Sequence, residues 1–165
     1  MENLDLGLNI NQKETANRVR IFFKYTFPNY LIKAGLHRTD LKSPQLNPTG
    51  IAVHGRNSAE IRMAQIFDMQ DKCRAVYQAI DHCSDSQNQP FRTILKALYI
   101  DELKDWQVAD KVKYSDSRYG DLKRYACCQF ADTIETWKVI YDVDIPDLKI
   151  INRCNIGAES GSGRG

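Results

Sequence analysis

The sequence lacks the features that place a protein in a membrane or mark it for export. No run of eighteen apolar residues occurs in its 165 residues, so we expect no membrane-spanning helix. The start, MENLDLGLNI, has no basic segment followed by an apolar core, which argues against a secretory signal. The five cysteines are an odd number and fit no disulfide framework, so reduced thiols are expected. These absences predict a cytoplasmic protein without a membrane partner.

Enzyme signatures are missing as well. The sequence has no Gly-rich phosphate loop and no nucleophile elbow. Cys73, His82 and Cys83 place soft ligands on one predicted helix, but no CxxC or HxxxH spacing completes a metal site. His37 and His54 have no evident carboxylate partners. We therefore predict no catalytic residue, no metal and no cofactor.

Charge is unevenly distributed along the chain. The formal net charge is only +2, yet residues 12–62 hold nine cations and three anions, which leaves about −4 for the remainder. A locally basic segment on a near-neutral protein is a footprint for a polyanion. The alternative is a solvated helix face.

Periodic apolar residues predict helices in the first half of the chain. Val19, Phe22 and Phe27 recur at helical spacing, with a kink or break expected at Pro28 and a cap at Gly35. Residues 36–57 have no period and contain prolines and glycines, so they are predicted to form a loop.

A longer helix is predicted to follow this loop, with Ser58 as its N-cap. Its apolar stripe steps by three and four residues through Met63, Ile66, Met69, Cys73, Val76, Ile80 and Cys83. Such a stripe is typical of an internal core. The alternative is a surface that docks a partner or a second copy of the chain.

Residues 90–137 predict three helices, and the last two form a helix-turn-helix at about 104–125. A helix through Ile100 is followed by a short helix over 105–112, a tight turn at 113–114 and a long helix capped by Ser115. Trp106, Ala109 and Tyr114 are expected to pack behind the long helix. Gly120 suggests a place where that helix approaches a phosphate or base closely, or else a tolerated surface glycine.

These residues resemble a known family. The segment ILKALYIDELKDWQVADKVKYSDSRYGDLKRYACCQFAD (94–132) resembles region four of bacterial sigma factors, and more closely the ArpU/RinA-type late-gene regulators of phages of Gram-positive bacteria. Those regulators pair a hydrophobic-LK-x-hydrophobic-Y-I helix, a W-x-V-A-D helix and a Y-S-x-x-x-Y-x-x-L-K-R recognition helix. The counterparts here are residues 95–100, 106–110 and 114–124. With the loop between LKSP (41–44) and NSAE (57–60), the resemblance covers about residues 12–138.

The resemblance implies an all-α protein with a C-terminal sigma region 4-like helix-turn-helix that binds double-stranded DNA and controls phage or prophage late genes in a bacterial host cell. The third helix would lie in the major groove. Arg118 would then pair with a base, and Ser117 and Asp121 would tune base choice. The expected phosphate contacts are Arg124, Lys123, Lys113 and Lys111, with Tyr125 beside them. The basic N-terminal segment would add backbone contacts from Arg18, Arg20 and Lys24.

The predicted organisation has three parts. Residues 1–57 form a basic helical segment and loop, 58–138 a helical domain with the helix-turn-helix, and 139–165 a tail that matches no recognised pattern. Two rival functions remain at this stage. One is a phage DNA-packaging protein of the small terminase type, which would assemble into a ring. The other is a sigma-like adaptor that binds RNA polymerase. A ring of many copies would indicate packaging, whereas a monomer or a homodimer would indicate regulation.

Overall fold

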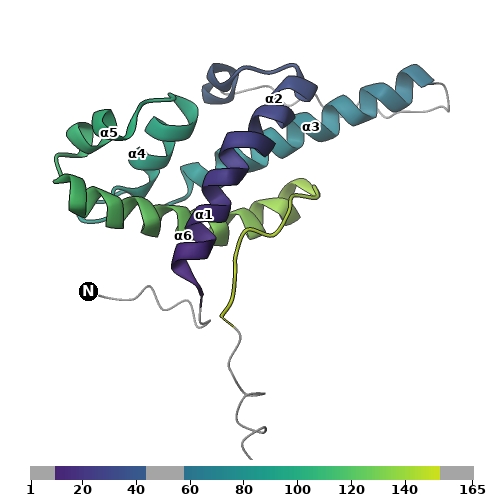
Figure 1. Cartoon of the computed structure of the whole chain (residues 1–165). Helices are drawn as coiled ribbons and strands as arrows, with labels where there is room; N and C mark the ends of the chain where they lie inside the picture. Colours follow the sequence, from purple (N-terminus) through teal and green to yellow (C-terminus); the bar gives the residue numbers. More distant parts are fainter. Residues whose placement is uncertain (1–9, 44–57, 153–165) are drawn as a thin grey trace, which may run out of the picture.

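The computed structural model describes residues 10–43 and 58–152, and all regular elements within these ranges are helices (Figure 1). The only β-type pairing in them is an isolated antiparallel bridge between Ile10 and Ile151. The prediction of an all-α protein is therefore confirmed. Within the same ranges, no helix combines the length and the apolar character needed to cross a membrane.

The N-terminal helices run without a break through Pro28. Helix α1 spans Gln12–Ile21, a π-helical turn η1 spans Phe22–Thr26, and α2 spans Phe27–Ala34. No break occurs at Pro28, and the chain instead widens into a π turn before the proline. In η1 the Phe27 amide donates to the carbonyl of Phe22, five residues back. A proline ring clashes with a carbonyl in a regular α-helix, and a π turn is one way to relieve this conflict. Gly35 ends α2 with φ +68°, as predicted.

The remaining helices follow in the expected order. A 3-10 helix η2 (Arg38–Lys42) lies inside the stretch predicted to be a loop, and residues 44–57 of that prediction lie outside the described residues. Helix α3 spans Ser58–Asp81, so Ser58 is its first residue. Then come α4 (Phe91–Leu95), the π-helical turn η3 (Lys96–Ile100), α5 (Asp105–Val112) and α6 (Asp116–Tyr141).

Helix α6 lies at the centre of the core. It packs against α1, α3 and α4, and α2 in turn packs against α3 (Figure 1). The aromatic residues of the two π turns meet here, since Phe23 stacks on Tyr99 with ring centroids 4.0 Å apart. The largest fully buried side chains come from all of these helices and include Phe27, Phe91, Phe130, Ile80, Ile94, Leu95, Leu122 and Ile134.

The apolar stripe of α3 is only half buried. Cys73, Val76 and Ile80 belong to the core, whereas Met63 and Ile66 are 47% and 38% exposed. The prediction that the whole stripe is internal is wrong for the first turns of the helix. Figure 1 shows the reason, because the N-terminal part of α3 extends past the helices that cover its second half.

The segment after α6 returns to the start of α1. Ile145 and Leu148 are buried in the common core. The Asn11 amide donates to the Ile150 carbonyl at 2.8 Å, and the Ile150 amide donates to the Thr15 hydroxyl at 3.0 Å. Residues 143–152 belong to the stretch predicted as a tail without a recognised pattern. They hold α1 in its position across α6 (Figure 1).

Candidate nucleic-acid interface

Helices α5 and α6 form two rods joined by a tight turn. Helix α5 begins after Lys104, whose amide donates to the Gln107 side chain at 2.8 Å. It ends at Lys113, which adopts the left-handed conformation with φ +61°. Ser115 then caps α6, because its hydroxyl accepts from the Arg118 amide at 3.3 Å. The predicted boundaries of both helices and the Ser115 cap agree with the structure.

The turn is held by contacts on the inner side of both helices. Val108 and Ala109 of α5 and Leu122 of α6 are buried. Tyr114 lies partly buried against the core, and its hydroxyl donates to the Gln87 carbonyl at 2.7 Å. Tyr114, expected to pack behind the long helix, is thus partly buried against the core and also joined to the loop that precedes α4.

Trp106 does not pack behind α6. It is 67% exposed, so the expectation that it supports the long helix is wrong. Trp106 lies in the first turn of α5, beside an open concavity rather than against a neighbouring helix. A large apolar side chain that stays in solvent contributes little to folding, because burial of apolar area is what stabilises the fold.

The residues predicted to contact DNA are all accessible to some degree. Ser117, Lys111 and Lys113 are exposed, and Arg118, Asp121 and Tyr125 are partly exposed. None of them is among the core residues. The first two turns of α6 therefore present a polar surface.

Ion pairs connect several of these residues to each other. The Arg124 guanidinium lies 3.2 Å from the Asp121 carboxylate and 5.3 Å from the centre of the Tyr125 ring. Lys123 lies 2.8 Å from the Asp105 carboxylate, and its side chain is only 18% exposed. Lys123 is thus largely committed to joining α5 to α6.

Asp105 is held by two donors at the start of α5. Lys123 and the Tyr119 hydroxyl each donate to the same carboxylate oxygen at 2.8 Å. Partial burial raises the pKa of Asp105, but these two hydrogen bonds outweigh it and the pKa lies below its usual value. Burial and the same hydrogen bond raise the pKa of Tyr119 far above its usual range. The bond therefore persists with an ionised carboxylate and a neutral phenol at neutral pH.

The cations of α1 differ in their positions. Arg20 lines the same concavity as Trp106 and Lys123. Arg18 donates to the Asp147 carbonyl at 3.3 Å and so faces the C-terminal segment, and Lys24 lies over the Tyr25 ring at 5.2 Å. Of the three, Arg20 is the one that the fold brings to the α5–α6 pair.

A concavity of about 560 Å³ lies between α1, the start of α5 and the start of α6. We call it the Trp106 concavity. Its charged side chains are balanced, with three cations and three anions. Gly120 is one of its lining residues, and a Cβ atom added there would meet no heavy atom within 4 Å. Its lining includes Arg20, Asp105, Trp106, Asp116, Gly120 and Lys123.

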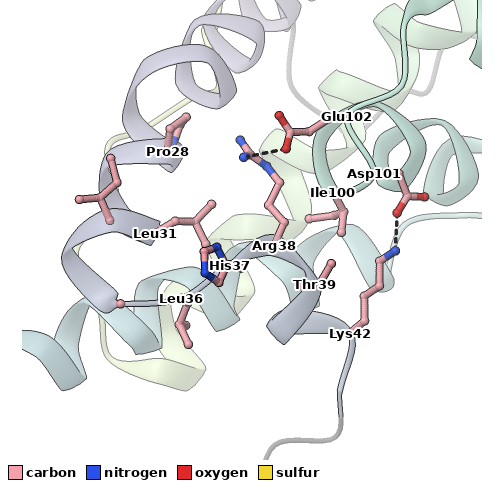
Figure 2. Close-up of a pocket in the computed structure, with 12 residues that line it drawn as sticks. Pro28, Leu31, Leu36, His37, Arg38, Thr39, Lys42, Ile100, Asp101 and Glu102 are labelled. Carbon is pink, nitrogen blue, oxygen red and sulfur yellow. Dashed lines mark hydrogen bonds and ion pairs between the residues drawn. The ribbon is translucent and has the colours of Figure 1, made fainter.

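A second concavity of about 800 Å³ lies between α2, η2 and the residues that follow η3 (Figure 2). Arg38 donates to the Tyr99 carbonyl at 2.8 Å and pairs with Glu102 at 3.2 Å. Lys42 pairs with Asp101. The basic side chains at this rim thus have carboxylate partners, and they tie η2 to the segment that leads into α5.

The described residues offer no metal centre and no activated thiol. Within 10–43 and 58–152, no group of three or more His, Cys, Asp or Glu residues is placed to hold a metal ion. Burial raises the pKa of Cys127 to about 11, and of three other thiols to about 12: Cys73, Cys83 and Cys128. Such thiols stay protonated and are poor nucleophiles.

Comparison with known proteins assigns no activity to this site. Residues 67–131 match a family described as "Protein of unknown function (DUF1492)". The match runs from the middle of α3 to the middle of α6 and includes the α5–α6 pair, but it covers less than half of the chain. No curated protein and no solved structure matches the chain.

Proposed function

We propose that this protein binds double-stranded DNA through the α5–α6 pair and regulates transcription, in the manner of the ArpU/RinA-type late-gene regulators that it resembles. The observation that carries the proposal is the geometry of residues 105–125. A short helix and a long capped helix are joined by a tight turn, and the first two turns of α6 present a polar surface. This is the arrangement with which helix-turn-helix proteins place a recognition helix in the major groove.

Within this proposal the residues of the α5–α6 pair that contact DNA are of two kinds. Arg118, with Ser117 and Asp121, reads base edges, since a guanidinium pairs bidentately with guanine. Lys111 and Lys113 are exposed at the end of α5 and contact phosphates, which fix register without reading sequence. Arg20 adds a backbone contact from α1.

Selection of bound sequences from a random duplex pool tests the proposal directly. An enriched motif, lost in Arg118→Ala and kept in Arg62→Ala, is the expected result. Arg62 is a suitable control because it is an exposed arginine on α3, away from the α5–α6 pair. Failure to enrich any sequence with the folded protein would contradict the proposal.

The balanced charge of the site favours one second candidate. Because Asp121 pairs with Arg124 and Asp105 with Lys123, the α6 face has less net positive charge than most DNA-binding surfaces. A sigma-like adaptor that binds RNA polymerase needs no such excess. Purified polymerase retaining the protein without duplex, together with an unenriched pool, would favour the adaptor.

A further inference from the structure

We infer that the Trp106 concavity is a contact site for the sugar–phosphate backbone of DNA, with the Trp106 indole packed on a deoxyribose and Arg20 on the adjoining phosphate. The inference rests on the proposed function, and it adds a site that the motif resemblance does not contain. Arg20 comes from α1, about 86 residues before Trp106 in the chain.

The exposure of Trp106 is the first observation. With 67% of its surface in solvent, the indole is the largest exposed apolar group of α5. Tryptophan is enriched at the centres of interfaces, where one flat face packs on a partner and excludes water. Its neighbours in the concavity are mostly polar, so the surface around the indole fits a partner that is itself amphipathic.

The shape of the concavity is the second observation. The space beside Gly120 is open, because no heavy atom lies within 4 Å of the position that a Cβ would take. A partner strand can therefore approach the α6 backbone beside Trp106. If α6 occupies the major groove, the strand that borders the groove passes the start of the preceding helix, which is where Trp106 lies.

The distribution of charge is the third observation. Asp105 is ionised, pairs with Lys123 and accepts a hydrogen bond from the Tyr119 hydroxyl, and Arg124 pairs with Asp121. Arg20 is exposed, and of the three cations that line the concavity it is the one outside the Lys123–Asp105 and Arg124–Asp121 pairs, although its charge also acts on Asp105. We therefore assign the phosphate contact to Arg20, with the carboxylates of Asp105 and Asp116 in the same lining as the groups that oppose it.

Fluorescence of Trp106 reports directly on the site. Trp137 is the only other tryptophan, so Trp137→Phe leaves Trp106 as the single probe in the full-length chain. Titration with a duplex is expected to quench and shift this emission. The binding curve is to be recorded with a selected sequence and with a random duplex of equal length.

Two variants separate this inference from the proposed function. Trp106→Ala should weaken binding about tenfold for the selected and the random duplex alike, because a sugar contact carries no sequence information. Arg20→Gln should lower the slope of log affinity against log salt by about one. Arg62→Ala serves as the matched control and should change neither quantity. Circular dichroism confirms that each variant folds.

The remaining outcomes overturn either the inference alone or the inference together with the proposed function. Wild-type protein that binds duplex while Trp106→Ala binds equally well, with unchanged Trp106 emission, overturns the inference and leaves the proposed function in place. Wild-type protein that binds no duplex overturns both. Weakening by Trp106→Ala that is confined to the selected sequence would show a base contact, and it also contradicts the backbone assignment.

Discussion

Replacement of Gly120 by alanine separates folding from binding at one position of α6. Glycine in a helix interior costs about 1 kcal/mol relative to alanine. A Cβ added at Gly120 meets no heavy atom within 4 Å, so the structure offers no steric cost to offset this gain. We therefore expect Gly120→Ala to stabilise the protein by about 1 kcal/mol, which for a chain of this size raises Tm by about 2–4 °C. The methyl group also projects into the Trp106 concavity, where it would keep a DNA strand from approaching the α6 backbone, so DNA binding should weaken.

The assay pairs thermal unfolding, followed by circular dichroism, with a DNA titration of the same sample. Thr136→Ala is the matched control, because Thr136 is exposed on the same helix far from the concavity and alanine also has the higher helix propensity there. The control should gain stability without a change in DNA affinity. A lower Tm for Gly120→Ala would refute the helix geometry at this position. A higher Tm with unchanged DNA affinity would show that Gly120 is a tolerated surface glycine.

Three further predictions concern the fold. Leu148→Ala should destabilise the protein by about 3 kcal/mol in urea unfolding, because its side chain is 2% exposed, and a loss below 1 kcal/mol would contradict the packing of the C-terminal segment. Asp105→Asn should lower stability by less than about 1 kcal/mol, since the Asp105 side chain of the Lys123 pair is 60% exposed. The folded pKa of Asp105 is lowered, so its contribution is complete above the unfolded value of about 3.9 and is lost as the pH falls below it; a difference between wild type and variant that persists at pH 2 would contradict this. Ellman's reagent should reach the four buried thiols only after unfolding, and rapid labelling of these thiols in native protein would refute their burial: Cys73, Cys83, Cys127 and Cys128.

Local signals made the α5–α6 pair predictable from sequence. Ser115 caps a helix through its own hydroxyl and the amide three residues later, a contact that needs no distant part of the chain. Periodic apolar residues likewise fix where α3 and α6 run. The helical character of the protein and the boundaries of these helices follow from such short-range rules.

The features that the sequence did not predict all depend on which elements pack against a residue in the folded protein. Periodicity places Trp106 on the side of Ala109, but it does not show that no neighbouring helix covers Trp106. Met63 continues the α3 stripe, yet the helices that cover Cys73 do not reach it. Ile145 and Leu148 gave no regular period, because an extended segment that packs through a few side chains has none.

The proximity of Arg20 to the α5–α6 pair likewise could not be predicted from the sequence. The sequence indicated a basic segment, but Arg18, Arg20 and Lys24 were equivalent within it. The crossing of α1 over α6 distinguishes them, since it points Arg18 at the C-terminal segment and Arg20 at the Trp106 concavity. The predicted recognition residues are exposed or partly exposed, and their contact with DNA stays a prediction.

The two π turns have a consequence for comparing this chain with its relatives. Each residue of an α-helix turns the chain by about 100°, and a π turn accommodates about one residue more than the regular helix. Phe22 and Phe23 are therefore both buried although they are adjacent. A relative that lacks η1 should show a one-residue gap near Phe23, and one that lacks η3 a gap near Tyr99. Since these two rings stack on each other, we expect the two gaps to occur together.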